Sequence, residues 1–174
     1  TLADARAIVV RYRLGLPDEV VAALNAEANE SPKPNDPAFR GSQYHLAARP
    51  TDAFEAAAAA IRTAGFDCIF LGDRVEGEAR DVAAAQAAIA RDLKAQGKRA
   101  VILSGGELTV TIRGNGRGGP NQEFAMALAA ELDGTSGIAA LAGDTDGTDG
   151  GAGSADDPAG AYVDGSTAKR ARAR

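Results

Sequence analysis

The chain has 174 residues, enough for one domain or for one domain with part of another, and its size alone demands no disulfide or cofactor. Its net charge of −5 argues against binding to nucleic acid or an anionic membrane, because both require a basic surface. A single cysteine excludes an internal disulfide, and no apolar run approaches the roughly 18 residues of a membrane span. Since the first residues also lack signal-peptide character, we expect a cytoplasmic protein.

Two helices are predicted at the start of the chain, over residues 2–14 and 17–28. The segment 29–43 contains three closely spaced prolines, which fix φ and remove backbone donors, so an irregular connector is expected there. This connector is the best domain boundary, and it divides the chain into residues 1–42 and 43–174.

After the connector, predicted strands alternate with predicted helices. The strands are expected at 44–48, 66–71, 100–103, 108–113 and 138–142, and the helices at 52–64, 78–96 and 121–132. This alternation is typical of an α/β domain with helices on both faces of a sheet. Because only Ser104-Gly-Gly-Glu107 separates two of the strands, we expect them to form an antiparallel hairpin within a mixed sheet.

A glycine-rich segment, Gly114-Asn-Gly-Arg-Gly-Gly119, lies between a predicted strand and a predicted helix. Exposed amides and a helix N-terminus at such a turn can bind a phosphate. Arg117 can bind a phosphate or a carboxylate through two parallel hydrogen bonds. The spacing matches the dinucleotide fingerprint, but the expected hairpin before it is the wrong context. Glycines that serve only a tight turn are the alternative interpretation.

Three aspartates follow the last predicted strand, in Asp144-Thr-Asp-Gly-Thr-Asp149. Carboxylates this close suit Mg²⁺, which takes one or two of them and keeps substrate oxygens and waters, so Asp144 and Asp146 are candidate metal ligands. Capping of the local turns by the same aspartates is an equally good interpretation.

The segment Ser104–Glu107 is either a plain turn or a second loop that faces an anion, with Glu107 as an acid, a base or an arginine partner. Glu123 lies in the first turn of a predicted helix, where favourable interaction with the helix dipole explains it as well as catalysis does. His45 has no serine or cysteine motif beside it, so no triad is expected. The candidate anion-binding residues are Ser104, Gly105, Gly106, Gly114, Gly116, Gly118, Gly119, Asn121 and Glu123.

Four ordered blocks together resemble the MOFRL-containing class II glycerate kinase family, many of whose members have been labelled hydroxypyruvate reductases. The blocks are Ser104–Thr111, Gly116–Glu123, Thr145–Gly150 and Ala159–Gly165. The resemblance covers nearly the whole chain. The chain is similar to the end of the family's first domain followed by most of its second, the MOFRL domain. One departure is Pro120, which stands where many members have a second arginine.

The resemblance implies a two-domain α/β kinase that uses ATP and Mg²⁺ to convert D-glycerate to 2-phosphoglycerate in the cleft between its domains. It implies that Arg117 neutralises substrate carboxylate or transferring phosphate. The family's large amino-terminal region has no counterpart in this chain, so we expect the chain alone to be inactive without that domain. No nucleic-acid or membrane partner is expected, and a homodimer is one option for the assembly.

Two other functions stay open at this point. One is an NAD(P)H-dependent hydroxypyruvate reductase, in which Gly114–Gly119 binds the pyrophosphate and Asp144 the ribose. The other is a non-catalytic module that binds a sugar acid or a nucleotide.

Overall fold

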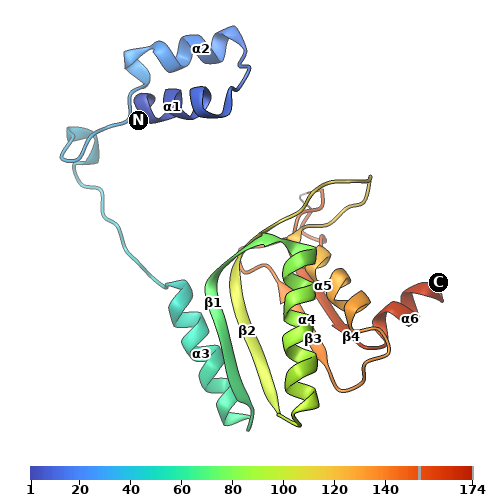
Figure 1. The fold of residues 1–174 in the computed structure, drawn as a ribbon. Helices are drawn as coiled ribbons and strands as arrows, with labels where there is room; N and C mark the ends of the chain where they lie inside the picture. Colours follow the sequence, from blue (N-terminus) through green and yellow to red (C-terminus); the bar gives the residue numbers. More distant parts are fainter. Residues whose placement is uncertain (153, 174) are drawn as a thin grey trace. The chain divides into compact units, whose positions relative to one another are not determined.

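A computed structural model describes residues 1–152 and 154–173. Contacts divide the chain into two compact units, Thr1–Leu46 and Ala47–Arg174 (Figure 1). The first unit contains α1 (Leu2–Tyr12), α2 (Asp18–Asn25) and the short 3₁₀ helices η1 (Glu27–Asn29) and η2 (Pro37–Phe39). The guanidinium of Arg6 in α1 donates to the Leu24 carbonyl in α2 at 2.8 Å, which ties the two helices together. Neither helix contains a fully buried residue.

The second unit has helices and strands in alternation. Its elements are α3 (Pro50–Thr63), β1 (Asp67–Glu78), α4 (Ala79–Ala95), β2 (Ala100–Thr109), α5 (Pro120–Glu131), β3 (Ala139–Gly143), β4 (Gly160–Asp164) and α6 (Thr167–Arg172). The α/β class is therefore confirmed. Among the described residues the strands form two small sheets, a parallel β1–β2 pair and an antiparallel β3–β4 pair, rather than one mixed sheet.

The predicted hairpin at Ser104–Glu107 is wrong, because these residues lie inside a single strand, β2, which pairs in parallel with β1. The glycines serve close packing instead of a turn. A Cβ on Gly106, where φ is +150°, would lie 2.1 Å from the Val75 carbonyl oxygen, so only glycine lets the two strands approach here. The strand predicted at 108–113 is likewise absent beyond Thr109.

The strand predicted at 44–48 is also wrong, since this segment forms no helix or strand. Its side chains are exposed, among them Tyr44 at 87% and Leu46 at 59%. The segment pairs with none of the strands that the structure describes, and a strand needs a partner for its backbone hydrogen bonds. His45 is consequently not part of a sheet, and its ring nitrogen lies 3.0 Å from the Gln43 side-chain oxygen.

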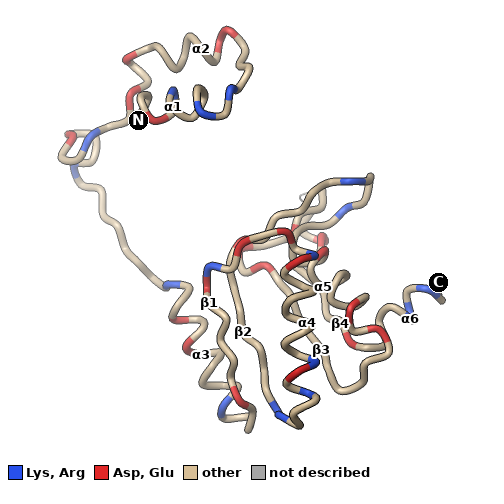
Figure 2. Tube along the Cα trace, viewed as in Figure 1, with Lys and Arg blue, Asp and Glu red and all other residues tan. Residues whose placement is uncertain are grey.

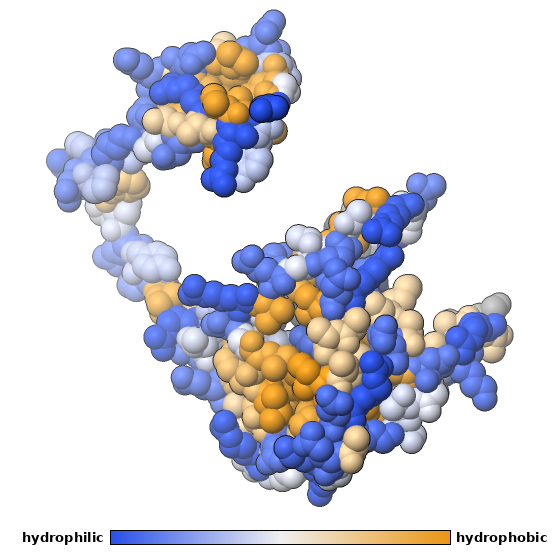
Figure 3. Space-filling model, in the orientation of Figure 1, coloured by the Kyte–Doolittle hydropathy of each residue, from blue (hydrophilic) through white to orange (hydrophobic). Residues whose placement is uncertain are grey.

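Helices cover both faces of the β1–β2 sheet. On one face, Phe54 of α3 packs against Phe70 with ring centroids 5.2 Å apart, and it lies directly over Gly105. On the other face, the Gln86 amide of α4 donates to the Ser104 hydroxyl at 3.1 Å. The cover is incomplete, because apolar side chains gather on the surface between α3 and α4 in Figure 3 and no residue of β1 or β2 is fully buried.

The buried core lies where α4 and α5 pack together and α5 covers the β3–β4 sheet. Small side chains let the two helices approach closely, as the alanine bias of the sequence favours. The core residues are Ala83, Ala87, Ala125, Leu128, Ala129, Leu132 and Val163. None of the helices in the described part of the chain could cross a membrane, given their length and polarity.

The turn between β4 and α6 contains a strongly perturbed carboxyl group. The Ser166 hydroxyl and backbone N–H donate to Asp164 at 2.7 Å and 2.8 Å, and the Arg170 guanidinium donates to it at 3.1 Å. These hydrogen bonds lower the pKa of Asp164 from 3.8 to about 2, and the bond from the Ser166 hydroxyl has the largest effect. They favour the charged form of Asp164 in the folded state.

Stability of the second unit should therefore depend on pH through Asp164. A carboxyl whose folded pKa is lowered adds stability above its unfolded pKa, and that contribution is lost as the pH falls from 3.8 towards 2. We expect the urea midpoints of the native chain and of Asp164→Asn to converge over this range. Midpoints that fall in parallel below pH 3.8 would contradict the assignment.

Candidate functional site

The glycine-rich loop that follows β2 is held at both of its ends. At its start, the backbone N–H and hydroxyl of Thr111 donate to Glu78 at 3.2 Å and 2.9 Å, which lowers the pKa of that carboxyl group. At its end, Gly119 begins α5 and lies against Asp149. The middle of the loop is exposed and contains the basic positions visible after β2 in Figure 2.

Arg117 lies in this exposed middle part, as the sequence predicts. Its guanidinium makes no hydrogen bond or ion pair with the residues that the structure describes. Gly114 and Gly116 are equally open, since a Cβ on either would meet none of the described heavy atoms within 4 Å. Both the arginine and the loop amides are thus presented to solvent, where an anion can reach them.

The N-terminus of α5 is already occupied by a side chain of the chain itself. Asp149, which is only 1% exposed, accepts from the backbone N–H groups of Asn121 at 3.0 Å and Gln122 at 2.7 Å. The Asn121 side-chain amide donates to the same carboxylate at 3.1 Å. Asn121 and the helix end therefore bind Asp149 in this structure, whereas the sequence predicts that they face an anion.

The other predicted ligands on β2 and α5 also have partners within the protein. Ser104, Gly105 and Gly106 take part in the packing of the β1–β2 sheet described above. Glu123 forms an ion pair with Arg80 of α4. These contacts give each residue a structural role, and the sequence contains no signal that brings Arg80 to Glu123.

Asp144 and Asp146 lie close together at the end of β3. Two interactions lower the pKa of Asp144. The first is a hydrogen bond between its carboxyl group and that of Asp146, and the second is the Asp146 backbone N–H, which donates to Asp144 at 3.1 Å. The same carboxyl–carboxyl hydrogen bond and the negative charge of Asp144 raise the pKa of Asp146, and Glu107 adds to this effect. The structure thus brings together the two predicted metal ligands, with the charge of Glu107 near them.

No group of three or more histidine, cysteine or acidic side chains could hold a metal ion within residues 1–152 and 154–173. A pair of carboxylates is nevertheless the number that Mg²⁺ commonly takes from a protein when substrate oxygens complete its coordination. The donor set therefore fits magnesium better than a metal that requires a full protein cage.

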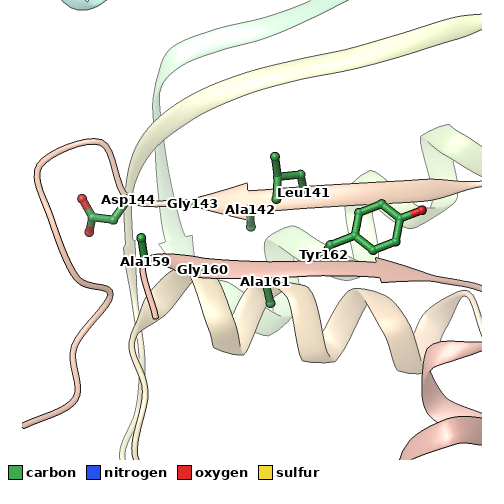
Figure 4. A pocket seen from close by; sticks show the side chains of 8 residues that line it. All are labelled: Leu141, Ala142, Gly143, Asp144, Ala159, Gly160, Ala161 and Tyr162. Atoms are coloured by element: carbon green, nitrogen blue, oxygen red, sulfur yellow. The ribbon is translucent and has the colours of Figure 1, made fainter. Parts of the chain in front are cut away.

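Asp144 also borders a shallow cavity of about 500 Å³ on the outer face of the β3–β4 sheet (Figure 4). Ala142 and Ala161 point towards α5, while the side chains of Leu141 and Tyr162 lie on the opposite face and are 77% and 61% exposed. The cavity combines an apolar wall with one carboxylate at its end. No motif in the sequence points to this surface.

The position of Asp149 differs most from what the sequence predicts. The sequence suggests that Asp149 caps its own turn, whereas the structure shows that it caps a helix 27 residues earlier in the chain. A signal does exist, because α5 begins at Gly119-Pro120 and has no serine, threonine, aspartate or asparagine at its N-cap. Such a helix start needs an acceptor from elsewhere in the chain.

Comparison with known proteins gives a consistent family. Residues 100–174 match the MOFRL family. A putative hydroxypyruvate reductase of Agrobacterium vitis is 46% identical in an alignment of 146 positions that covers 80% of this chain and 32% of that protein. The D-glycerate 2-kinase of Thermotoga maritima is 32% identical in an alignment of 177 positions that covers 99% of this chain and 40% of the kinase.

Solved structures agree with the sequence matches. A crystal structure of glycerate kinase from Thermotoga maritima is similar with a TM-score of 0.71 and 33% identity, over 99% of this chain and 40% of that one. A Pyrococcus horikoshii protein has a TM-score of 0.63 and 29% identity over the same shares. The chain spans 32% to 40% of the length of the relatives described here. On these matches, residues 100–174 match the MOFRL family, and the chain as a whole is similar to part of the glycerate kinases that contain it.

Proposed function

We propose that the protein in which this chain operates transfers the γ-phosphoryl group of ATP to a hydroxyl of D-glycerate and forms 2-phosphoglycerate. The observation that carries this proposal is the pairing of an exposed arginine loop with an adjacent two-carboxylate loop in a chain that matches a D-glycerate 2-kinase over 99% of its length. In the transfer, the substrate oxygen bonds to the γ-phosphorus, the bond to the β–γ bridging oxygen breaks, and ADP leaves.

Each loop has a defined role in this proposal. Arg117 binds the carboxylate of D-glycerate or the transferring phosphate, and the amides beside Gly114 and Gly116 bind the remaining oxygens. Asp144 and Asp146 would hold Mg²⁺, which supplies charge neutralisation when it is bound. Glu107, whose charge reaches Asp146, is the candidate for receiving the hydroxyl proton.

Catalysis by such a site is mostly positioning and charge neutralisation, so every part of it must be present together. The relatives are two to three times as long as this chain, as the shares of 32% to 40% imply. We therefore propose that activity also requires the remaining part of a protein of that length.

The reductase is the second candidate, because relatives from Agrobacterium vitis are named putative hydroxypyruvate reductases. In the dinucleotide-binding mode, the pyrophosphate lies on the N-terminus of the helix that follows the glycines. The Asp149 carboxylate takes that place on α5 and would repel a pyrophosphate. This contact favours the kinase over the reductase.

The proposal is tested by incubating the complete gene product and the 174-residue chain separately with ATP, Mg²⁺ and D-glycerate. Phosphorus NMR should show ATP-dependent formation of 2-phosphoglycerate by the complete product, no product after chelation of Mg²⁺, and little or none with the chain alone. Oxidation of NADH by hydroxypyruvate in place of phosphorylation would reject the kinase. Equal phosphorylation by both proteins would reject the requirement for further sequence.

A further inference from the structure

Asp149 joins the two loops of the candidate site through contacts of its side chain and its backbone. Its carboxylate accepts from the N–H groups of Asn121 and Gln122, as described above. Its backbone carbonyl accepts from the Gln122 side chain at 2.8 Å, and its N–H donates to the Pro158 carbonyl at 2.9 Å. Asp149 is thus bonded to the start of α5 on one side and to the segment before β4 on the other.

The backbones around these hydrogen bonds are in close contact. A Cβ on Gly119 would lie 2.6 Å from the Asp149 carboxylate, and one on Gly150, where φ is +72°, would lie 2.3 Å from the Gly118 carbonyl oxygen. Only glycines permit this approach. The end of the Arg117 loop and the end of the acidic loop are therefore packed directly against each other.

Asp149 is also the one charged residue, among those that the structure describes, that is buried. A buried carboxylate is tolerated only when hydrogen bonds replace its lost hydration, and three N–H donors at the start of α5 provide them. A further anion at this helix end would have to displace Asp149 into a position without those donors.

We propose that Asp149 is a positioning residue that closes the N-terminus of α5 to external anions and holds the Arg117 loop beside the Asp144–Asp146 pair. This inference rests on the proposed function for the nature of the ligand, a phosphate-bearing one. It deepens that function, because it directs the phosphate to Arg117 and the exposed loop amides and away from the helix end that the glycine motif suggests.

Amide NMR of the chain with inorganic phosphate as the probe tests this inference. In the unmodified chain, phosphate should leave the Asn121 and Gln122 signals unchanged, and these amides should exchange slowly with solvent. In Asp149→Ala the same amides should exchange about 3- to 30-fold faster, as the loss of a helix cap predicts. Phosphate should then shift their signals and restore their protection, because the vacated helix end is an anion site.

Two further variants make the test specific. Asp149→Asn keeps one acceptor oxygen but places a donor opposite the second amide, so it should show a smaller effect and keep the variant folded. Asp157→Asn is the matched control: Asp157 also accepts from two backbone amides, of Ala152 and Ser154 at 2.8 Å each, but among the described residues it makes no hydrogen bond to α5 or to the glycine loop. It should leave the Asn121 and Gln122 amides unchanged.

Phosphate-induced shifts at Asn121 and Gln122 in the unmodified chain would overturn the inference, since Asp149 would then be displaceable. Unchanged exchange in both Asp149 variants would also overturn it. Faster exchange in Asp149→Ala without any phosphate response would overturn it as well, since Asp149 would then stabilise the helix end without closing an anion site. Because none of these measurements requires turnover, their outcome is independent of whether the protein phosphorylates D-glycerate.

Discussion

Replacing Arg117 with alanine in the complete gene product should lower kcat/KM for the proposed phosphorylation of D-glycerate about 100- to 1,000-fold, the usual effect of removing one donor that stabilises transition-state charge. Arg117 is exposed on a loop that Glu78 and Asp149 hold at its two ends, and none of the described residues competes for its guanidinium. The loss is measured by steady-state assay of 2-phosphoglycerate formation. Arg117→Lys should recover only part of it, because lysine retains the charge but not the paired donors.

The matched control for Arg117 is Arg113→Ala, since Arg113 is an exposed arginine on the same loop. Its charge acts on Glu78, where it helps to lower the carboxyl pKa, so its removal should change turnover only slightly. Full activity of Arg117→Ala, in a protein whose folding is unchanged by circular dichroism, would remove Arg117 from the site. Equal losses in both variants would point to a general effect of loop charge instead.

Replacing Leu132 with alanine should destabilise the second unit by about 2–5 kcal/mol, the range for a large-to-small change in a packed core. Leu132 is fully buried and follows α5 directly, within the cluster of alanines that joins α4 to α5. Small neighbours cannot move far enough to fill the cavity that the missing atoms leave. Urea unfolding should show a lower midpoint with an unchanged m-value.

Met126→Ala provides the comparison for Leu132→Ala on the same helix. Met126 is 67% exposed, so its truncation should change the free energy of unfolding by about 0.5 kcal/mol or less. Similar losses for the two variants would mean that α5 does not pack as described. Such a result would also contradict the described site, because α5 carries the amides that bind Asp149.

Local sequence signals are enough to predict α3, α4 and α5 and where they end. Gly65 and Gly97 follow α3 and α4 with φ values of +79° and +67°, as expected of glycines that stop helices. These signals are local, because a helix forms its hydrogen bonds within one segment. The exposed position of Arg117 and the proximity of Asp144 and Asp146 follow from neighbours in the sequence in the same way.

The pairing of segments depends instead on contacts between residues that are distant in the chain. Ser104–Glu107 has the composition of a turn, yet it extends β2, because β1 supplies hydrogen-bond partners about 30 residues away. Asp149 has the pattern of a turn residue, yet it caps α5, because that helix has no cap of its own. In both cases the deciding partner is distant in the chain, so the local pattern at Ser104–Glu107 or at Asp149 does not identify that partner. The capping of α5 by Asp149 gives the candidate site its shape, since this buried carboxylate fills the helix end and leaves the Arg117 loop open to a ligand.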